Sequence, residues 1–175
     1  MQIQNPQNQD EVRLLLIDKP LEWTSFDVVN KLRRILNTKK IGHAGTLDPL
    51  ATGLLIICVG KMTKQIEKFM GLEKEYTGTF VIGRTTPSHD LETPVSEEAD
   101  YSAITNETIA TAARSLTGSI SQLPPMHSAI RVGGKRAYAF ARKGKEVELQ
   151  PRNVEVSTFE ITGIRLPEVD FRIVC

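Results

Sequence analysis

One short segment, residues 42–53, constrains this chain more than any other. It reads Gly-His-Ala-Gly-Thr-Leu-Asp-Pro-Leu-Ala-Thr-Gly and leads directly into the apolar run 54–59. Glycine adopts backbone angles that other residues avoid, so three glycines and a proline in a dozen residues predict a tightly shaped loop. Loops held by a rigid scaffold often carry the chemistry of a protein. The only ionisable side chains here are His43 and Asp48, so any reaction depends on one carboxylate.

The composition is that of a globular protein. The chain has 175 residues, of which 40% are hydrophobic and 25% charged, and this profile excludes a disordered or fibrous protein. No apolar run is long enough to cross a bilayer, and the polar N-terminus lacks the layout of a signal peptide. We expect a cytoplasmic protein with a polar tail over residues 1–12 and one domain over 13–175. Its two cysteines give no disulfide framework, and Cys58 is expected to be a reduced core residue.

Charge is segregated along the chain, although the net charge is only +1. Two stretches carry basic residues without any acid: Lys31, Arg33, Arg34, Lys39 and Lys40 in the first, and Arg131, Lys135, Arg136, Arg142, Lys143 and Lys145 in the second. The segment 90–107 is acidic and contains no Lys or Arg. Either basic stretch alone is typical of a solvated helix face, but the two together indicate a phosphate-rich partner.

Hydrophobic periodicity predicts a mixture of strands and helices. Strands are expected over 14–17, 54–59, 76–84, 128–132, 154–165 and 169–174. Helices are expected after Thr24, over 63–70, after Thr105 and over 136–143. Residues 85–104 contain two prolines and most of the acidic segment, and are expected to form a long surface excursion. Because strands and helices follow no regular βαβ order, the pattern predicts an α+β domain with a largely antiparallel sheet.

Two of the predicted helices carry clear sequence signals. Thr24 and Asp27 have the spacing of a capping box. The apolar positions that follow, Val28, Leu32, Ile35 and Leu36, recur at helical spacing. In the helix after Thr105, the residues expected to face inward are Ile109, Ala112, Ala113 and Leu116, with Gly118 at the end.

Several kinds of functional site are excluded by their missing residues. Gly60-Lys61 follows a strand, but a phosphate-binding P-loop needs glycine at Leu55 and Ser or Thr at Met62. The three histidines are scattered, and no cysteine pair has the spacing of zinc ligands. The chain also lacks a nucleophile elbow and a dinucleotide fingerprint, and the loop offers one carboxylate where glycosidase chemistry needs two that face each other. Asp48 remains, although an aspartate before proline often only initiates a turn.

Four separate motifs resemble those of the bacterial tRNA pseudouridine-55 synthase family, the TruB type. The segment 42–55, with Gly-Lys-Met-Thr-Lys at 60–64 behind it, is similar to the catalytic motif of that family. Lys19-Pro20 and Trp23-Thr24-Ser25 resemble its N-terminal motif, and Glu75-Tyr76 stands where the family has its aromatic active-site strand. A later signature is matched by residues 124–129, 134–138 and 141–142. The likeness covers residues 14–175.

The resemblance implies a pseudouridine synthase fold, in which a mixed, largely antiparallel sheet is flanked by helices. It implies isomerisation of uridine 55 to pseudouridine in the T-loop of tRNA by a monomer, with base flipping and without metal or organic cofactor. Asp48 would be the nucleophile. The substrate-binding residues implied are His43, which fills the gap left by the flipped base, Tyr76, which stacks on the uracil, Lys19, which buttresses the loop, and Thr46 and Leu47. Lys135, Arg136, Arg142 and Lys143 would contact RNA phosphates.

The C-terminus departs from the family pattern. In the family a Lys-Gly-Thr-Tyr-Ile-Arg segment follows the strand that corresponds to residues 171–175, and its arginine pairs with the catalytic aspartate. This chain stops within that strand, which indicates an N-terminal catalytic portion. One alternative is a catalytically incomplete fragment that acts only as an RNA-binding module. Others are a fragment without independent function and a scaffold repurposed for a different RNA.

Overall fold

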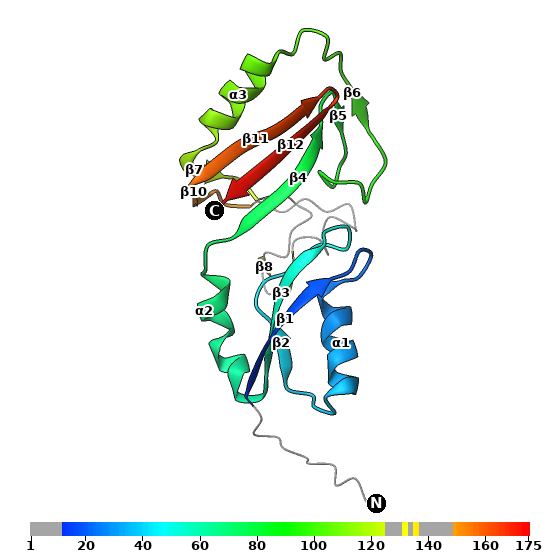
Figure 1. Ribbon diagram of the computed structural model, residues 1–175, viewed down its shortest axis with the longest axis vertical. Helices are drawn as coiled ribbons and strands as arrows, with labels where there is room; N and C mark the ends of the chain where they lie inside the picture. The colour runs from blue at the N-terminus through cyan, green and yellow to red at the C-terminus, as the bar shows by residue number, and fades with distance from the viewer. Residues whose placement is uncertain (1–11, 125–130, 133–134, 137–148) are drawn as a thin grey trace, which may run out of the picture. The chain divides into compact units, whose positions relative to one another are not determined.

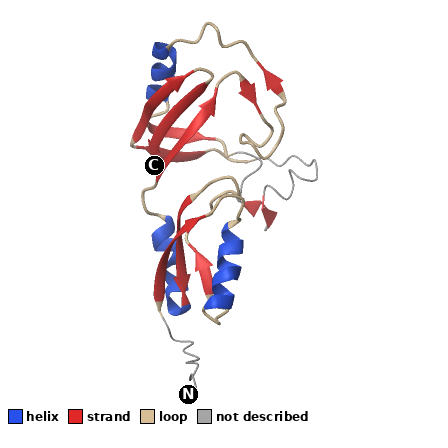
Figure 2. Cartoon of the chain, turned by 45° about the vertical axis from the view of Figure 1, so that its right-hand side comes forward, coloured by secondary structure: helices blue, strands red, loops and turns tan. Residues whose placement is uncertain are grey.

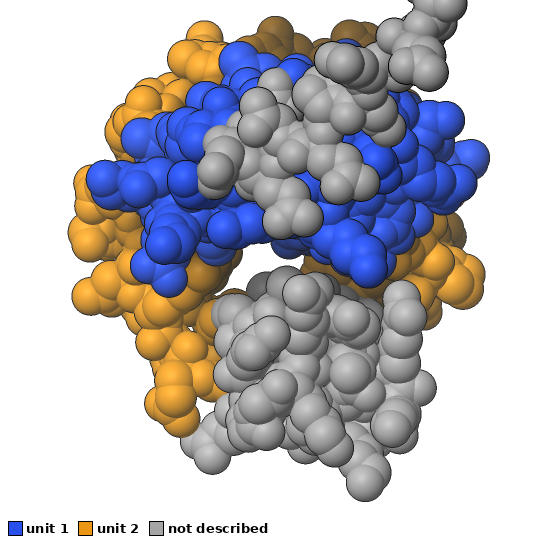
Figure 3. Space-filling view, turned by 90° about the horizontal axis from the view of Figure 1, so that it is seen from below, with its two compact units in different colours: residues 1–72 blue, residues 73–175 orange. Residues whose placement is uncertain are grey.

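The computed structural model describes residues 12–124, 131–132, 135–136 and 149–175. The chain divides into two compact units, Met1–Leu72 and Glu73–Cys175, here called unit 1 and unit 2 and coloured blue and orange in Figure 3. Each unit is built from antiparallel strands and at least one helix (Figures 1 and 2). Among the described residues no helix is long and apolar enough to span a membrane.

Unit 1 is a three-stranded antiparallel sheet with helices on either side (Figure 2). Its elements are β1 (Arg13–Lys19), α1 (Ser25–Ile35), β2 (Ile41–His43), β3 (Gly53–Val59), the 3-10 helix η1 (Gly60–Gln65) and α2 (Ile66–Met70). Strand β3 lies in the centre, between β1 and β2. Val28 and Val29 of α1 pack in one buried cluster with Ile41, Leu55, Ile57 and Val59 of the sheet.

The capping box predicted at the start of α1 is confirmed. The Thr24 hydroxyl oxygen accepts the Asp27 N–H at 3.1 Å, and the Asp27 carboxylate accepts the Thr24 N–H at 2.9 Å. Both donors belong to the set that a helix N-terminus leaves without intrahelical partners. The Thr24 hydroxyl also donates to the Asp27 carboxylate at 2.6 Å, and this bond, together with the one from the Thr24 N–H, holds the pKa of Asp27 below its usual value. The start of α1 is therefore fixed by its own side chains.

Unit 2 contains a three-stranded antiparallel sheet of order β11-β12-β4. Its elements are β4 (Glu75–Val81), β5 (Arg84–Thr85), β6 (Glu97–Glu98), α3 (Asn106–Ser115), β7 (Gly118–Gln122), β8 (Arg131–Val132), β9 (Lys135–Arg136), β10 (Arg152–Val156), β11 (Thr158–Arg165) and β12 (Glu168–Val174). Strand β10 pairs with β7, β5 with β6, and β8 with β9. Helix α3 contacts β11 (Figure 1).

Three predicted strands differ from the structure. The strand expected over 76–84 ends at Val81, because Gly83, with φ +80°, turns the chain into β5. The segment 85–104, expected to form a long surface excursion, includes β6, which pairs with β5. The strand expected over 154–165 is two strands, because the chain changes partner at Ser157, from β7 to β12. Within 128–132, the described residues form only β8, at 131–132.

Other differences concern helices. The helix expected over 63–70 begins three residues earlier, as the 3-10 helix η1. Ala112 of α3 and Leu116, which follows the helix, are exposed, so only Ile109 and Ala113 of the four expected residues face inward. From Gly118 onward the chain forms β7, which periodicity did not predict. Residue 136 belongs to strand β9 instead of opening a helix, and the rest of the predicted basic helix lies outside the described residues.

Candidate functional site

The loop between β2 and β3 depends on glycine for its backbone angles. Gly45 has φ +110° and Gly53 has φ +113°, values that residues with a side chain rarely adopt. A Cβ at either position would meet no atom of the described residues within 4 Å, so conformation rather than space requires glycine there. Between these two glycines the chain carries Thr46, Leu47 and Asp48.

Lys19, the last residue of β1, is completely buried beneath this loop. Alternate residues of β1 face the core, and this period of two carries Lys19 to the same face as Leu15 and Ile17. Its Nζ donates to the carbonyl oxygens of Pro20 at 3.0 Å, Trp23 at 2.5 Å and Pro49 at 3.3 Å. Burial lowers the pKa of Lys19, while the negative charges of Asp48 and Asp27 act to raise it. The side chain thus ties β1 and the segment 20–23 to the loop.

Ser25, the first residue of α1, holds the loop at a second point. Its hydroxyl oxygen accepts the Leu47 N–H at 2.9 Å and the same hydroxyl donates to the Leu47 carbonyl at 3.1 Å. Ser25 is 3% exposed. The Leu47 side chain packs against the core cluster of unit 1. Leu47 is therefore fixed through both its backbone and its side chain.

Asp48 lies between the two anchored residues of the loop. On one side Leu47 is held by Ser25. On the other, the Pro49 carbonyl accepts the Glu22 N–H at 2.8 Å as well as the Lys19 ammonium. The Asp48 carbonyl accepts the Ala51 N–H at 3.0 Å, which closes a turn. Asp48 is nevertheless exposed, so the fold fixes its backbone and leaves its side chain accessible to solvent.

His43 ends β2 at the entrance to the same loop. Its Nδ1–H donates to the carbonyl oxygen of Gly45, so Nε2 is the acceptor nitrogen when the ring is neutral. The ring is half-buried, and Thr46, three residues further along the chain, is exposed. Five of the six residues expected to form the substrate site, Lys19, His43, Thr46, Leu47 and Asp48, thus belong to unit 1.

The sixth residue, Tyr76, belongs to unit 2. It lies on β4 opposite Ile173 of β12 and is 43% exposed. Alternate strand residues share a face, so Tyr76 lies on the same side of the sheet as Phe80. The Phe80 and Phe171 rings stack with centroids 4.2 Å apart. Strand β4 therefore carries an accessible aromatic ring beside an aromatic cluster.

The four residues expected to contact RNA phosphates fall in the least described part of the chain. Lys135 and Arg136 form strand β9, while Arg142 and Lys143 lie outside the described residues. Two residues that hold the loop were not among those predicted: Ser25, and Glu22 through its backbone amide. A serine that follows a capping threonine carries no sequence signal for a contact 22 residues further along the chain.

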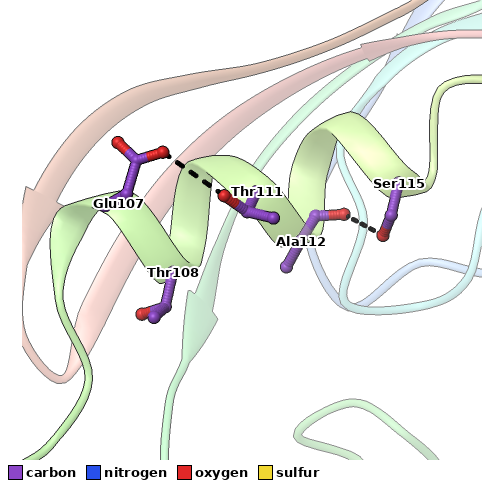
Figure 4. Close-up of a pocket in the computed structure, with 5 residues that line it drawn as sticks. All are labelled: Glu107, Thr108, Thr111, Ala112 and Ser115. Atoms are coloured by element: carbon purple, nitrogen blue, oxygen red, sulfur yellow. Dashed lines mark hydrogen bonds between the residues drawn. The ribbon is translucent and has the colours of Figure 1, made fainter.

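A shallow pocket in unit 2 lies along α3 and is lined by none of these residues. It is lined by one helix face: Glu107, Thr108, Thr111, Ala112 and Ser115 (Figure 4). The polar groups of this face bond to each other, since the Thr111 hydroxyl donates to Glu107 at 3.4 Å and the Ser115 hydroxyl to the Ala112 carbonyl at 2.8 Å. This face holds one carboxylate and no partner for acid–base chemistry, so the candidate site remains the loop around Asp48.

Solved structures with the same fold define the class of protein. The chain aligns with the structure titled "Crystal Structure of a Cbf5-Nop10-Gar1 Complex" with a TM-score of 0.68 and 25% identity, over 95% of this chain and 40% of that one. A structure of an H/ACA RNP bound to a substrate RNA containing 2'-deoxyuridine aligns with a TM-score of 0.62 and 24% identity, over 92% and 37%. The chain therefore has the α+β pseudouridine synthase fold, as expected.

Sequence comparison places the chain within that class. Residues 33–175 match the family model described as "TruB family pseudouridylate synthase (N terminal domain)". A tRNA pseudouridine synthase B of Flavobacterium johnsoniae is 51% identical over 97% of this chain and 77% of its own length. One from Phocaeicola vulgatus is 49% identical over 96% and 74%. The chain belongs to the TruB family of pseudouridylate synthases, which are isomerases.

Proposed function

We propose that this chain carries the catalytic residues of an enzyme that converts uridine 55 of tRNA to pseudouridine. Relatives about half identical to it are named tRNA pseudouridine synthase B, and they match nearly its whole length. The observation that carries the proposal is the position of Asp48, an exposed carboxylate whose two neighbours in the chain are anchored. Catalysis needs a reacting group held close to one geometry, and this loop provides it.

Asp48 acts as the nucleophile in this proposal. Its carboxylate attacks the sugar or the base while the bond from N1 of uracil to the sugar breaks. The detached uracil turns within the site and rejoins the sugar through C5, which gives up its hydrogen to solvent as N1 gains one. Covalent capture by a carboxylate divides a difficult exchange of bonds into easier steps. The site must also keep water away from the detached base.

The target base has to leave its stack before it can react. Flipping a nucleotide out of folded RNA requires roughly a few kcal/mol, which contacts in the flipped state must offset. We assign to His43 the space vacated by the base, since it stands at the entrance to the Asp48 loop. Tyr76 is assigned the stacking contact with uracil, because its ring is accessible and can also present a hydroxyl.

Unit 1 supports an RNA partner through its charge. Between residues 12 and 72 the chain has ten Lys and Arg against five Asp and Glu. Arg33, Arg34, Lys39 and Lys40 form no ion pair with any of the described residues. By contrast, Arg84, Arg114, Arg165 and Arg172 of unit 2 each pair with a carboxylate. We therefore add these four cations of unit 1 to Lys135, Arg136, Arg142 and Lys143 as proposed phosphate contacts.

The proposal treats residues 13–175 as one catalytic domain that acts as a monomer on the T-arm stem-loop in the cytoplasm. It is tested with the complete product of the reading frame and tRNA tritiated at C5 of uridine. Tritium release from tRNA, and none when uridine 55 is replaced by cytidine, is the expected result. Tight binding without release would favour an RNA-binding module, and release from an unrelated RNA would favour a repurposed scaffold.

A further inference from the structure

The Ser25 hydroxyl makes two hydrogen bonds that helix α1 does not need. Thr24 already caps the helix, because its hydroxyl oxygen accepts the Asp27 N–H at 3.1 Å. Ser25 points instead to the loop, where it accepts the Leu47 N–H at 2.9 Å and donates to the Leu47 carbonyl at 3.1 Å. The buried Ser25 side chain thus forms hydrogen bonds with both the backbone N–H and the backbone carbonyl of one residue, 22 positions away.

The position of that residue gives the contact its significance. Leu47 immediately precedes Asp48, and any rotation of the Leu47 backbone displaces the Asp48 carboxylate. Pro49, on the other side, is already held by Lys19 and by the Glu22 amide. Without Ser25, the backbone of the residue immediately before Asp48 would lose both of these hydrogen bonds, whereas Pro49 after it would keep its own.

We propose that Ser25 is a positioning residue for the reaction, which sets the direction of the Asp48 carboxylate through the backbone of Leu47. This inference rests on the proposed role of Asp48. Ser25 itself contacts no reacting atom. Its removal should therefore slow the chemical step and leave RNA binding unchanged, because a displacement of about 1 Å at a reacting group can reduce the rate roughly 100-fold.

The test compares Ser25→Ala with Thr24→Ala in the complete protein. Thr24→Ala removes the cap from the same helix and lowers its stability, but it leaves the bonds to Leu47 in place. We expect Ser25→Ala to reduce kcat roughly 10- to 100-fold with KM and the RNA dissociation constant unchanged. We expect Thr24→Ala to keep the wild-type kcat although its unfolding midpoint falls. Amide exchange at Leu47 should accelerate in Ser25→Ala and not in Thr24→Ala.

Two further substitutions at position 25 test whether kcat follows the strength of the hydrogen bonds to Leu47. Ser25→Thr keeps the hydroxyl and should restore kcat, whereas Ser25→Cys keeps the volume, weakens both hydrogen bonds and should give an intermediate kcat. The Cys variant decides the question if Ser25→Ala does not fold. Equal losses of kcat in Ser25→Ala and Thr24→Ala, or a change confined to KM, would overturn the proposal.

Asp48→Asn is measured in the same assay. If Asp48→Asn is inactive while both Ser25→Ala and Ser25→Cys react at the wild-type rate, the proposed role of Ser25 is wrong and the proposed role of Asp48 is supported. If Asp48→Asn remains active, the proposed function itself fails.

Discussion

The ammonium of Lys19 donates to the carbonyl oxygen of Pro49 at 3.3 Å, across thirty residues of sequence. This contact joins the end of a core strand to the residue that follows Asp48. A fully buried lysine is unusual, because removing its charge from water is unfavourable. Here three carbonyl oxygens replace the lost water, so the side chain serves as an anchor for the loop.

Replacing Lys19 by methionine should destabilise unit 1. The three carbonyl oxygens would lose their donor, and each buried polar group left without a hydrogen bond lowers the free energy of unfolding by about 1–3 kcal/mol. Part of this loss is offset, because the variant no longer buries a charge. We expect a net loss of about 1–3 kcal/mol, measured by urea unfolding. Lys39→Met is the matched control at an exposed lysine of the same unit and should change stability by less than about 0.5 kcal/mol. Equal stability of the two variants would contradict the anchoring role.

The sheet of unit 2 should lose a stabilising interaction in acid. Arg172 donates to the Glu75 carboxylate at 2.6 Å, and this bond holds the pKa of Glu75 below its ordinary value of 4.5. The carboxylate is therefore charged in the folded chain at pH values where it is protonated in the unfolded one. Its contribution to stability is complete above pH 4.5 and disappears as the pH falls through the lowered pKa.

Arg172→Met tests this assignment through the titration of Glu75, followed by NMR of its side-chain carboxyl. Without the guanidinium the pKa of Glu75 should rise toward 4.5. Glu160, the weaker partner of Arg172 at 3.5 Å, offers a comparison, since Glu160→Gln should leave most of the lowering of the Glu75 pKa intact. An unchanged Glu75 pKa in Arg172→Met would refute the assigned cause.

Gly78→Ala should disrupt the aromatic cluster beside Tyr76. A Cβ at position 78 would lie 2.7 Å from Cζ of Phe171, which packs directly above the glycine. Overpacking of this kind lowers the free energy of unfolding by about 1–3 kcal/mol.

Gly71→Ala is the control, because its Cβ would lie 3.8 Å from the nearest atom. A glycine with compatible backbone angles and space should gain about 0.4–1 kcal/mol on this change. In a Phe171→Leu background, Gly78→Ala should lower the free energy of unfolding by less than it does in the wild type. An equal loss in both backgrounds would rule out the clash.

Salt dependence of RNA binding should distinguish the proposed phosphate-contacting cations of unit 1 from the paired ones of unit 2. If Lys39 and Lys40 neutralise phosphates, their conversion to glutamine should reduce the slope of log affinity against log salt by roughly 0.7–0.9 for each phosphate that is no longer neutralised. Arg84→Gln is the control, because Arg84 is paired with Glu98 at 3.1 Å and its replacement should leave the slope unchanged. Identical slopes in all variants would remove these lysines from the interface.

Local signals in the sequence predicted the local features of the fold. The capping box of Thr24 and Asp27 depends on residues close together in the chain and was predicted correctly. The glycine loop is present but shorter than the predicted 42–53, because residues 42 and 43 belong to β2 and residue 53 begins β3. Strand boundaries that depend on which strand lies alongside were not predicted correctly. The pattern around Ser157 predicts one strand, although the chain pairs with β7 before this residue and with β12 after it. A run of β-forming residues carries no information about which strand lies beside it.

The candidate site was predictable to a similar degree. Asp48 follows from being the only carboxylate in a glycine-rich loop, together with the resemblance of its surroundings to one family. The burial of Lys19 follows in retrospect from the alternation along β1. Ser25 did not follow from either argument, because its contact with Leu47 arises only when α1 and the loop pack on the same sheet. Hydrogen bonds between distant segments are a result of the fold and leave no local pattern.

The most direct test of the central claim is single-turnover conversion of a tritiated T-arm stem-loop by Asp48→Asn in the complete protein. Asparagine keeps the shape of the side chain and removes its charge. We predict that tritium release falls by at least roughly 10⁴-fold while the stem-loop is bound as tightly as by the wild type. Turnover by Asp48→Asn at a rate close to that of the wild type would contradict the account.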